Sequence, residues 1–316
     1  LMQAGRLADA RRELASHLAE HPGDGEAGYL LAVCARYQKD FAAAHGVLRE
    51  LVEREPENGR VWQELAHLAR DGGENGEAIR LYALATQTNP ALLASYRQRL
   101  ALLEAGGRAD EAARTRAQLA RLEALPEPLL AVTDLLSQGR VLRAESLCRQ
   151  FLQQTPHHPE AMRLLAEIGL RLGALEEAHF LLESACELDP DNAELRIALI
   201  RVLAKRQRFA ESLEQAERLL ASEPSNLQFR SMHAIELLQI GRYEEAIAAF
   251  DAILADVPDD PATLTSRGHA LKTCGRSGEA VASYERAATV RDHSEAWYAL
   301  ANLKTYRFDD GELAAM

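Results

Sequence analysis

Apolar residues recur along this chain at the spacing of an amphipathic α-helix. Two clear examples of the i, i+3, i+4, i+7 pattern are Leu195, Leu199, Val202 and Leu203, and Ile247, Phe250 and Leu254. This spacing places the apolar side chains on one face of a helix and leaves the opposite face polar. The pattern therefore predicts helices that each bury one face against a neighbour.

Three kinds of residue recur in step with a period of 34 residues. Prolines stand at Pro22, Pro56, Pro90, Pro156, Pro190, Pro224 and Pro258. Small residues stand at Ala10, Ala44, Ala78, Ala112, Ala144, Ala178, Ser212, Ala246 and Ala280. Glycines stand at Gly5, Gly73, Gly107, Gly139, Gly173, Gly241 and Gly275, and the same place holds Lys39 and Gln207 in two units. Ala112 and Ala144 are only 32 residues apart, so one unit has lost two residues.

Each of these markers has a mechanical reason. Proline lacks an amide donor and clashes inside a helix, so it ends the second helix of a unit. Glycine at the middle of the unit permits the positive φ of a helix C-terminus. The small residue five positions later lets two antiparallel helices approach closely. We therefore predict a small-residue contact within every helix pair.

The repeat unit resembles the tetratricopeptide consensus. Between residues 61 and 90, the family's places are held by Trp62, Leu65, Gly73, Ala78, Tyr82, Ala85 and Pro90. The resemblance covers essentially the whole chain and is weakest at residues 93–124, where Arg99 replaces a leucine. It implies an all-α fold, a right-handed superhelical solenoid of antiparallel helix pairs that binds a protein or peptide in a concave groove.

Counting repeats divides the chain into four segments. Residues 1–24 form a partial repeat with only its second helix, and residues 25–124 form repeats one to three. Residues 125–293 form repeats four to eight after the two-residue slip, and residues 294–316 form a terminal helix and the start of a linker. The units begin near residues 25, 59, 93, 125, 159, 193, 227 and 261. An orphan helix at residues 1–24 leads us to expect that the chain begins inside a larger protein.

Composition narrows the functional classes. The formal net charge of −12 disfavours a nucleic-acid partner, and no apolar run approaches the length of a membrane span. The four cysteines show no CxxC pairing, which predicts free thiols in the reducing cytoplasm. Arginine greatly outnumbers lysine, a bias that suggests a bacterial source.

No residue pattern predicts catalysis within residues 1–316. The loop Gly275-Arg276-Ser277-Gly278 could cradle phosphate, but no strand pattern precedes it and Gly275 is the ordinary mid-repeat glycine. His157 and His158 lie at a turn between repeats, and neighbouring imidazoles do not readily bind one metal. We therefore predict no catalytic, cofactor-binding or metal-binding residues in this chain.

The family resemblance also implies which residues line the groove. In tetratricopeptide arrays the first helices line it, through the second, fifth, sixth, ninth and thirteenth places of each unit. Applied to this chain, this rule selects Arg60, His67, Arg97, Arg163, Arg171, Arg201 and Lys205, to which we add Lys272 at the neighbouring twelfth place of its unit. Four of these cations lie in adjacent units and predict an acidic peptide ligand: Arg163, Arg171, Arg201 and Lys205. Acids interrupt the strip (Glu64, Glu160, Glu167 and Glu194), so a solvated face of mixed charge is the alternative.

The C-terminal sequence from Ala299 to Phe308 reads ALANLKTYRF. It resembles the junction of bacterial proteins in which a tetratricopeptide array precedes a sulfotransferase domain. The resemblance implies a parent enzyme that uses 3′-phosphoadenylyl sulfate and a C-terminal catalytic domain as the array's own partner. The family's donor loop does not occur before Met316, so no catalytic residue is carried over. The sequence favours the recognition arm of such an enzyme; the alternatives are a free-standing adaptor and the arm of a repeat-bearing glycosyltransferase.

Overall fold

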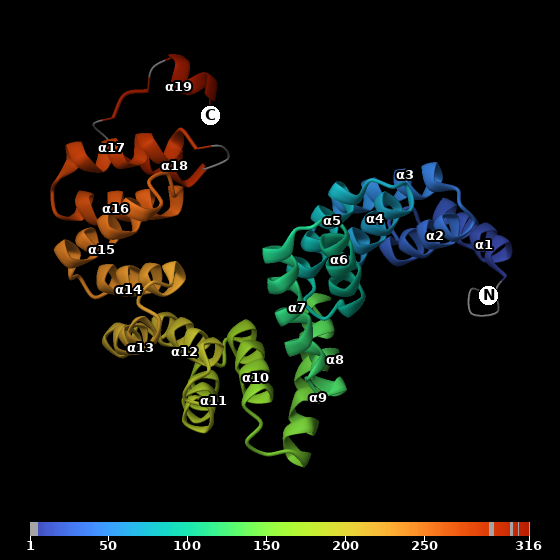
Figure 1. Cartoon of the computed structure of the whole chain (residues 1–316), viewed down its shortest axis with the longest axis horizontal. Coiled ribbons are helices and arrows are strands. Elements are labelled where there is room, and N and C mark those ends of the chain that lie inside the picture. Colours follow the sequence, from blue (N-terminus) through green and yellow to red (C-terminus); the bar gives the residue numbers. More distant parts are fainter. Residues whose placement is uncertain (1–5, 291–293, 304–305, 309, 316) are drawn as a thin grey trace. The chain divides into compact units, whose positions relative to one another are not determined.

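The computed structural model describes residues 6–290, 294–303, 306–308 and 310–315, and all regular structure in these residues is helical (Figure 1). The chain divides into two compact units, residues 1–156 and 157–316. The helices of unit 1 are α1 (Leu7–Glu20), α2 (Gly25–Tyr37), α3 (Phe41–Arg54), α4 (Gly59–Asp71), α5 (Asn75–Thr88), α6 (Leu93–Ala105), α7 (Ala109–Glu123), α8 (Glu127–Ser137) and α9 (Val141–Gln154). Those of unit 2 are α10 (Pro159–Leu172), α11 (Leu175–Leu188), α12 (Ala193–Lys205), α13 (Phe209–Ser222), α14 (Leu227–Gln239), α15 (Tyr243–Asp256), α16 (Pro261–Thr273), α17 (Ser277–Ala288), α18 (Ser294–Ala301) and α19 (Asp310–Ala315).

Consecutive helices pack in pairs within each unit. In unit 1, α2 packs on α3, α4 on α5, α6 on α7 and α8 on α9, and unit 2 continues with the pairs α10–α11 to α16–α17. The all-α prediction of stacked helix pairs is confirmed. The first helices begin at Gly25, Gly59, Leu93, Glu127, Pro159, Ala193, Leu227 and Pro261.

Each first helix follows a proline turn, and most are capped by the residue two places after the proline. The side chains of Asp24, Asn58 and Asn192 accept a hydrogen bond from a backbone N–H in the first turn of α2, α4 and α12. Asn226 and Asp260 do the same for α14 and α16. These caps satisfy amide groups that have no partner inside the helix.

The turn inside each pair uses a left-handed residue. Gly173 ends α10 at φ +79°, and Ala174 then donates its backbone N–H to the carbonyl of Gly169 (2.8 Å). Lys39 and Gln207, which replace glycine in two units, adopt the same conformation at φ +61° and +58°. The position therefore demands a positive φ whatever the residue, and glycine meets that demand at the lowest cost.

The recurring small residues are buried at the crossing of each helix pair. Ala44, Ala78, Ala144, Ala178, Ser212, Ala246 and Ala280 have no measurable solvent exposure, and Ala112 is 3% exposed. At the crossing of α10 and α11, a methyl group built on Gly169 would lie 3.4 Å from Cβ of Ala178. The two backbones thus approach as closely as small side chains permit.

The two-residue slip changes how α8 is built. Pro126 precedes α8, Pro128 lies in its first turn, and the helix has 11 residues where most first helices have 13. Its apolar residues Leu129, Val132 and Leu136 are buried. Asp134 stands at the place that Ile168 and Val202 fill in α10 and α12, so α8 carries a carboxylate where other units carry an apolar side chain.

Candidate functional site

First helices of neighbouring repeats contact one another directly, α2 with α4 in unit 1, and α10 with α12 and α14 with α16 in unit 2. We call the surface that they share the first-helix face of each unit. The residues that the sequence selected for a groove are all on first helices. The two faces differ in how far their polar side chains are already paired.

On unit 1, long polar side chains bridge from each first helix to the next. Arg36 of α2 donates from Nε to Glu64 Oε2 of α4 (2.7 Å), and both side chains are at most a tenth exposed. Gln63 of α4 donates to the hydroxyl of Ser95 on α6 (2.9 Å). Arg70 of α4 donates to Gln98 Oε1 of α6 (2.9 Å). The polar groups of this face therefore satisfy one another and hold the first helices in register.

Arg60, a predicted groove residue, is also paired within unit 1. Its guanidinium donates to Asp134 Oδ2 of α8 (2.8 Å), and the buried amide of Asn89 donates to Asp134 Oδ1 (2.7 Å). Gln138 completes the set by donating to Asp134 Oδ2 (2.7 Å). One carboxylate thus ties α8 to the second repeat, although Arg60 lies 74 residues away in sequence.

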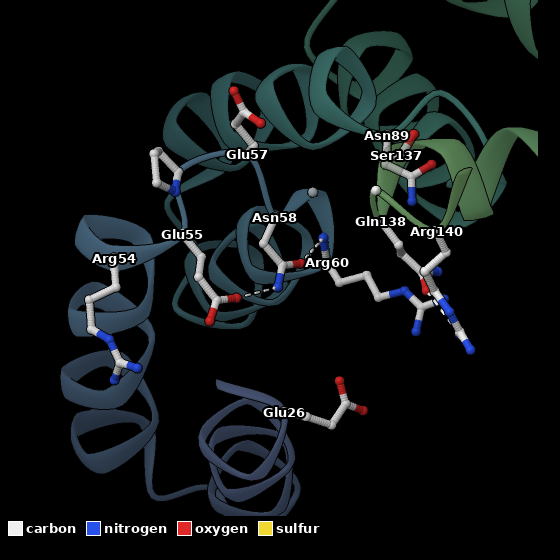
Figure 2. A pocket seen from close by; sticks show the side chains of 13 residues that line it. Glu26, Arg54, Glu55, Glu57, Asn58, Arg60, Asn89, Ser137, Gln138 and Arg140 are labelled. Carbon is white, nitrogen blue, oxygen red and sulfur yellow. Dashed lines mark hydrogen bonds between the residues drawn. The ribbon is translucent and has the colours of Figure 1, made fainter. Parts of the chain in front are cut away.

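Beside this tie lies a pocket of about 610 Å³, shown in Figure 2. The side chains of Arg60 and Arg140 extend into it from α4 and from the start of α9, and Glu26 enters from α2. Asn58 donates to Glu55 Oε2 (3.0 Å) and caps α4 (Figure 2). The walls of the pocket carry charged groups of both signs, whereas a typical small-molecule site has a mainly apolar surface. We therefore interpret it as a polar cleft at the junction of α4 and α8.

The other predicted residues of unit 1 are paired as well. Arg97 donates to Glu123 Oε1 (2.6 Å) at an exposed position. The Nδ1 atom of His67 lies 2.6 Å from the hydroxyl of Tyr82 on α5. Burial, together with the nearby Arg36 and Arg70, lowers the pKa of His67 to about 4. This imidazole is therefore neutral at physiological pH.

On unit 2, the first two predicted cations are neutralised by acids of their own helix. Arg163 pairs with Glu160 (2.7 Å) and Glu167 (3.5 Å), and Arg171 also pairs with Glu167 (2.9 Å). Burial opposes the charge of Arg163, but hydrogen bonds and the charges of these acids raise its pKa overall. The structure thus joins Arg163 and Arg171 through a shared carboxylate.

Arg201 and Lys205 of α12 are different. Both side chains are exposed, and among the described residues neither has an acidic group within ion-pair distance. They lie four residues apart on one face of α12, so they are neighbours on its surface. Lys272 of α16 is likewise exposed. Among the predicted groove cations, those without an acidic partner in the described residues are therefore on unit 2.

Apolar side chains lie next to these cations. Ile197, one turn before Arg201, and Met232 of α14 both pack on the buried cluster that contains Ile200 and Phe229. Ile235 is exposed to 37% and lies one turn after Met232 on α14. This face thus offers an apolar strip beside two basic side chains.

The loop that could have cradled phosphate serves the repeat turn. Gly275 adopts φ +78°, and Arg276 pairs with Glu279 (2.7 Å) and Glu244 (3.2 Å). His158 caps α10, since its Nδ1 accepts from the backbone N–H of Ala161 (3.3 Å). Over the part of the chain that the structure describes, no group of three His, Cys, Asp or Glu side chains could hold a metal ion. Nor is any described helix long and apolar enough to cross a membrane.

The segment after α18 packs back on the array. Leu303 is buried, and Tyr306 and Phe308 cover the apolar cluster that contains Leu300. Tyr306 donates its hydroxyl to Glu285 Oε1 (3.0 Å), and the rings of Trp297 and Phe308 are in contact. Lys304 and Thr305 lie outside the described residues.

Two acidic residues were not identified from the sequence, although their places in the repeat distinguish them. Asp134 and Glu236 occupy the tenth place of their units, where most units have an apolar residue. Glu236 is 5% exposed, and its Oε2 atom has no hydrogen-bond partner in the structure. A carboxylate at an apolar place of an otherwise regular repeat was the available signal.

Comparisons with known proteins bear on the repeats. Tetratricopeptide repeat models match residues 1–59 and 35–92, and another matches residues 262–293. The tetratricopeptide domain of cytochrome c-type biogenesis protein H matches residues 138–264. A search of curated proteins finds no match.

Among solved structures, MamA AMB-1 covers 51% of this chain and 96% of its own at 20% identity and a TM-score of 0.46. MamA from Desulfovibrio magneticus RS-1 covers 52% and 95% at 14% identity and a TM-score of 0.47. This likeness concerns the fold alone. The family matches leave residues 294–316 uncovered, and also residues 93–137, the stretch that holds Arg99 and the slip before α8. With helix pairs of the expected period on both sides of that stretch, the chain belongs to the tetratricopeptide-repeat proteins.

Proposed function

We propose that this chain is a protein-binding scaffold whose first-helix face of unit 2 holds an acidic peptide through Arg201 and Lys205. Repeat arrays of this kind present extended surfaces to other proteins, which supports the general role. The observation that supports the specific site is the contrast between the two faces. Arg60, Arg97 and Arg163 are paired with acids of this chain, whereas Arg201 and Lys205 have no acidic partner among the described residues.

Charge supports the same assignment. The chain carries a formal net charge of −12, yet no described carboxylate lies within ion-pair distance of Arg201 or Lys205. An acidic ligand would complete these pairs and would also be attracted to the site over short distances. The overall negative charge would make binding weak and sensitive to salt.

The spacing on α12 suggests a ligand pattern. Ile197, Arg201 and Lys205 follow one another at intervals of four residues, about 6 Å along the helix axis. In an extended peptide, alternate side chains on one face are about 6.6 Å apart. A segment of the form apolar-x-acid-x-acid would therefore place its side chains opposite these three residues.

The test is fluorescence anisotropy with a labelled peptide of this pattern. We expect Arg201→Glu/Lys205→Glu to weaken binding at least about tenfold, which corresponds to about 1.4 kcal/mol. The matched control, Arg80→Glu/Arg218→Glu, makes the same charge change on exposed arginines of the second helices α5 and α13. Equal affinity of wild type and the α12 double variant, with both chains folded by circular dichroism, would refute the site.

A finer proposal concerns the protein to which the array belongs. The sequence from Ala299 to Phe308 supports the recognition arm of a bacterial, cytoplasmic sulfotransferase that uses 3′-phosphoadenylyl sulfate. On this proposal the gene continues past Met316 into an α/β domain whose first strand runs into a Gly/Ser/Thr loop. Calorimetry should then detect donor binding by the intact protein and none by residues 1–316. A gene that ends at Met316 would remove the enzyme and leave the adaptor.

A further inference from the structure

Two units of the array contain the same pair of polar aromatic residues. Histidine stands at the ninth place of a unit in His67 and His269, and tyrosine stands at the twenty-fourth place in Tyr82 and Tyr284. The other units have neither residue at these places; their ninth places hold Val33, Ala101, Thr133, Glu167, Arg201 and Ile235. The histidine and the tyrosine therefore occur together in this chain.

The structure pairs them in the same geometry in both units. The hydroxyl of Tyr82 lies 2.6 Å from Nδ1 of His67, and that of Tyr284 lies 2.9 Å from Nδ1 of His269. The ring centroids are 5.4 Å apart in both pairs. Both tyrosines are fully buried, and Gly268 makes room for one of them, since a methyl group there would lie 2.4 Å from the ring of Tyr284.

Burial of the hydroxyl decides where the proton lies. A buried hydroxyl needs an acceptor for its hydrogen, and Nδ1 is the partner that the structure gives to the hydroxyl of Tyr82 and to that of Tyr284. If Nδ1 carried the proton, the hydroxyl hydrogen would be left without an acceptor, which is unfavourable. The tyrosine therefore donates to Nδ1, and the imidazole proton lies on Nε2. The same reasoning disfavours imidazolium, in which both nitrogens are protonated.

We infer that His67 and His269 are neutral hydrogen-bond donors, and that the Nε2–H group of each binds a main-chain carbonyl oxygen of a peptide on the first-helix face of its own unit. Both imidazoles are partly exposed, and no described residue is hydrogen-bonded to either Nε2. In the imidazole ring, the N–H bond of Nε2 points away from Nδ1, the nitrogen that is hydrogen-bonded to the buried tyrosine. Neither Nε2 is among the buried side-chain atoms that lack a partner, so each donor is accessible from outside the helix pair.

Burial is the main cause that favours the neutral state of both imidazoles. Around His67 lie Arg36 of α2 and Arg70, Asp71 and Glu64 of α4, and the burial and arginines that lower its pKa outweigh the opposing Asp71. Around His269 lie Glu295 of α18 and Lys272 of α16; burial lowers the pKa of His269, the charge of Glu295 opposes this shift, and Lys272 adds a smaller contribution in the same direction as burial. Both histidines therefore offer a donor without adding a charge. Such a donor suits the uncharged peptide backbone, so this inference does not depend on Arg201 and Lys205.

The protonation state is testable by NMR on the full chain with ¹⁵N-labelled histidine. We expect two-bond couplings to identify His67 as the Nε2–H tautomer from pH 5 to 8, and His269 as the same tautomer at pH 8 with a pKa below that of an unstructured histidine peptide, which is the reference. In Tyr82→Phe, which keeps the ring, His67 should lose its single tautomer and its pKa should rise. Tyr29→Phe, on the same face and without a histidine contact, is the matched control. The inference would be overturned if wild type showed an Nδ1–H tautomer, or if His67 had the same pKa as the histidine of the reference peptide.

The ligand is tested with an uncharged probe, an acetylated and amidated (Gly-Ser)₅ peptide. Saturating peptide should shift the Nε2–H resonances of His67 and His269 downfield, and His67→Phe/His269→Phe should lower the affinity about fivefold or more. The His67→Gln/His269→Gln variant, which retains an N–H donor, should recover part of that loss. If the resonances do not move in wild type, carbonyl recognition is wrong, whatever the outcome for acidic peptides.

Discussion

Replacing Ala178 by leucine is the sharpest test of how the helix pairs are packed. Ala178 is fully buried in a cluster with Leu182, Leu199 and Val202. On the facing helix, a methyl group added to Gly169 would already lie 3.4 Å from Cβ of Ala178 and 3.2 Å from the carbonyl oxygen of Ala174. The crossing of α10 and α11 therefore has no space for an isobutyl group unless the helix axes move apart.

The magnitude follows from overpacking. Forcing extra methylene groups into a well-packed core typically costs about 1–3 kcal/mol. With a urea dependence of about 2 kcal/mol per molar, the midpoint of the transition that includes unit 2 should fall by about 0.5–1.5 M. Circular dichroism during urea titration measures this shift, and hydrogen exchange would place the loss of protection in α10 and α11.

The matched control puts the same side chain at an exposed place of the same helix. Glu187 is exposed on α11, so Glu187→Leu should change the free energy of unfolding by less than about 0.5 kcal/mol. Equal midpoints for Ala178→Leu and Glu187→Leu would show that the small residues do not set the helix spacing.

Two further changes test the charged residues that stand at apolar places. Asp134→Ala removes the acceptor of the buried Asn89 amide, so we expect the free energy of unfolding of unit 1 to fall by about 1–3 kcal/mol. Helix α8 should also become more susceptible to limited proteolysis. Unchanged cleavage would contradict the proposal that Asp134 holds α8 in place. Burial raises the pKa of Glu236 in the folded state. The folded chain therefore keeps a proton that the unfolded chain releases above about pH 4.5. The free energy of unfolding should consequently fall as the pH rises through the raised pKa. Glu236→Leu should remove this dependence and stabilise unit 2 by about 1–2 kcal/mol at pH 7, measured by urea titration at several pH values, whereas a parallel pH dependence in both proteins would count against it.

The amino-acid sequence by itself determined the helices and their pairing. A tetratricopeptide unit contacts only its neighbours, so proline, glycine and the small residue act over short distances and can be read from their period. The turn that needs a positive φ illustrates this, because Lys39 and Gln207 take the glycine conformation at places that the period had marked. The same locality explains why the groove residues could be assigned to first helices without a structure.

Only the tertiary structure decided which of those side chains are available. Arg60 and Arg163 look alike in sequence to Arg201, but Asp134 and Glu160 pair with the first two and no described acid pairs with the third. Such pairing depends on side-chain conformations and on the position of α8 relative to α4. Neither can be read from a 34-residue period. The sequence also could not predict which nitrogen of His67 and His269 carries the proton. That position depends on a tyrosine hydroxyl that becomes buried only when the two helices of a unit pack together.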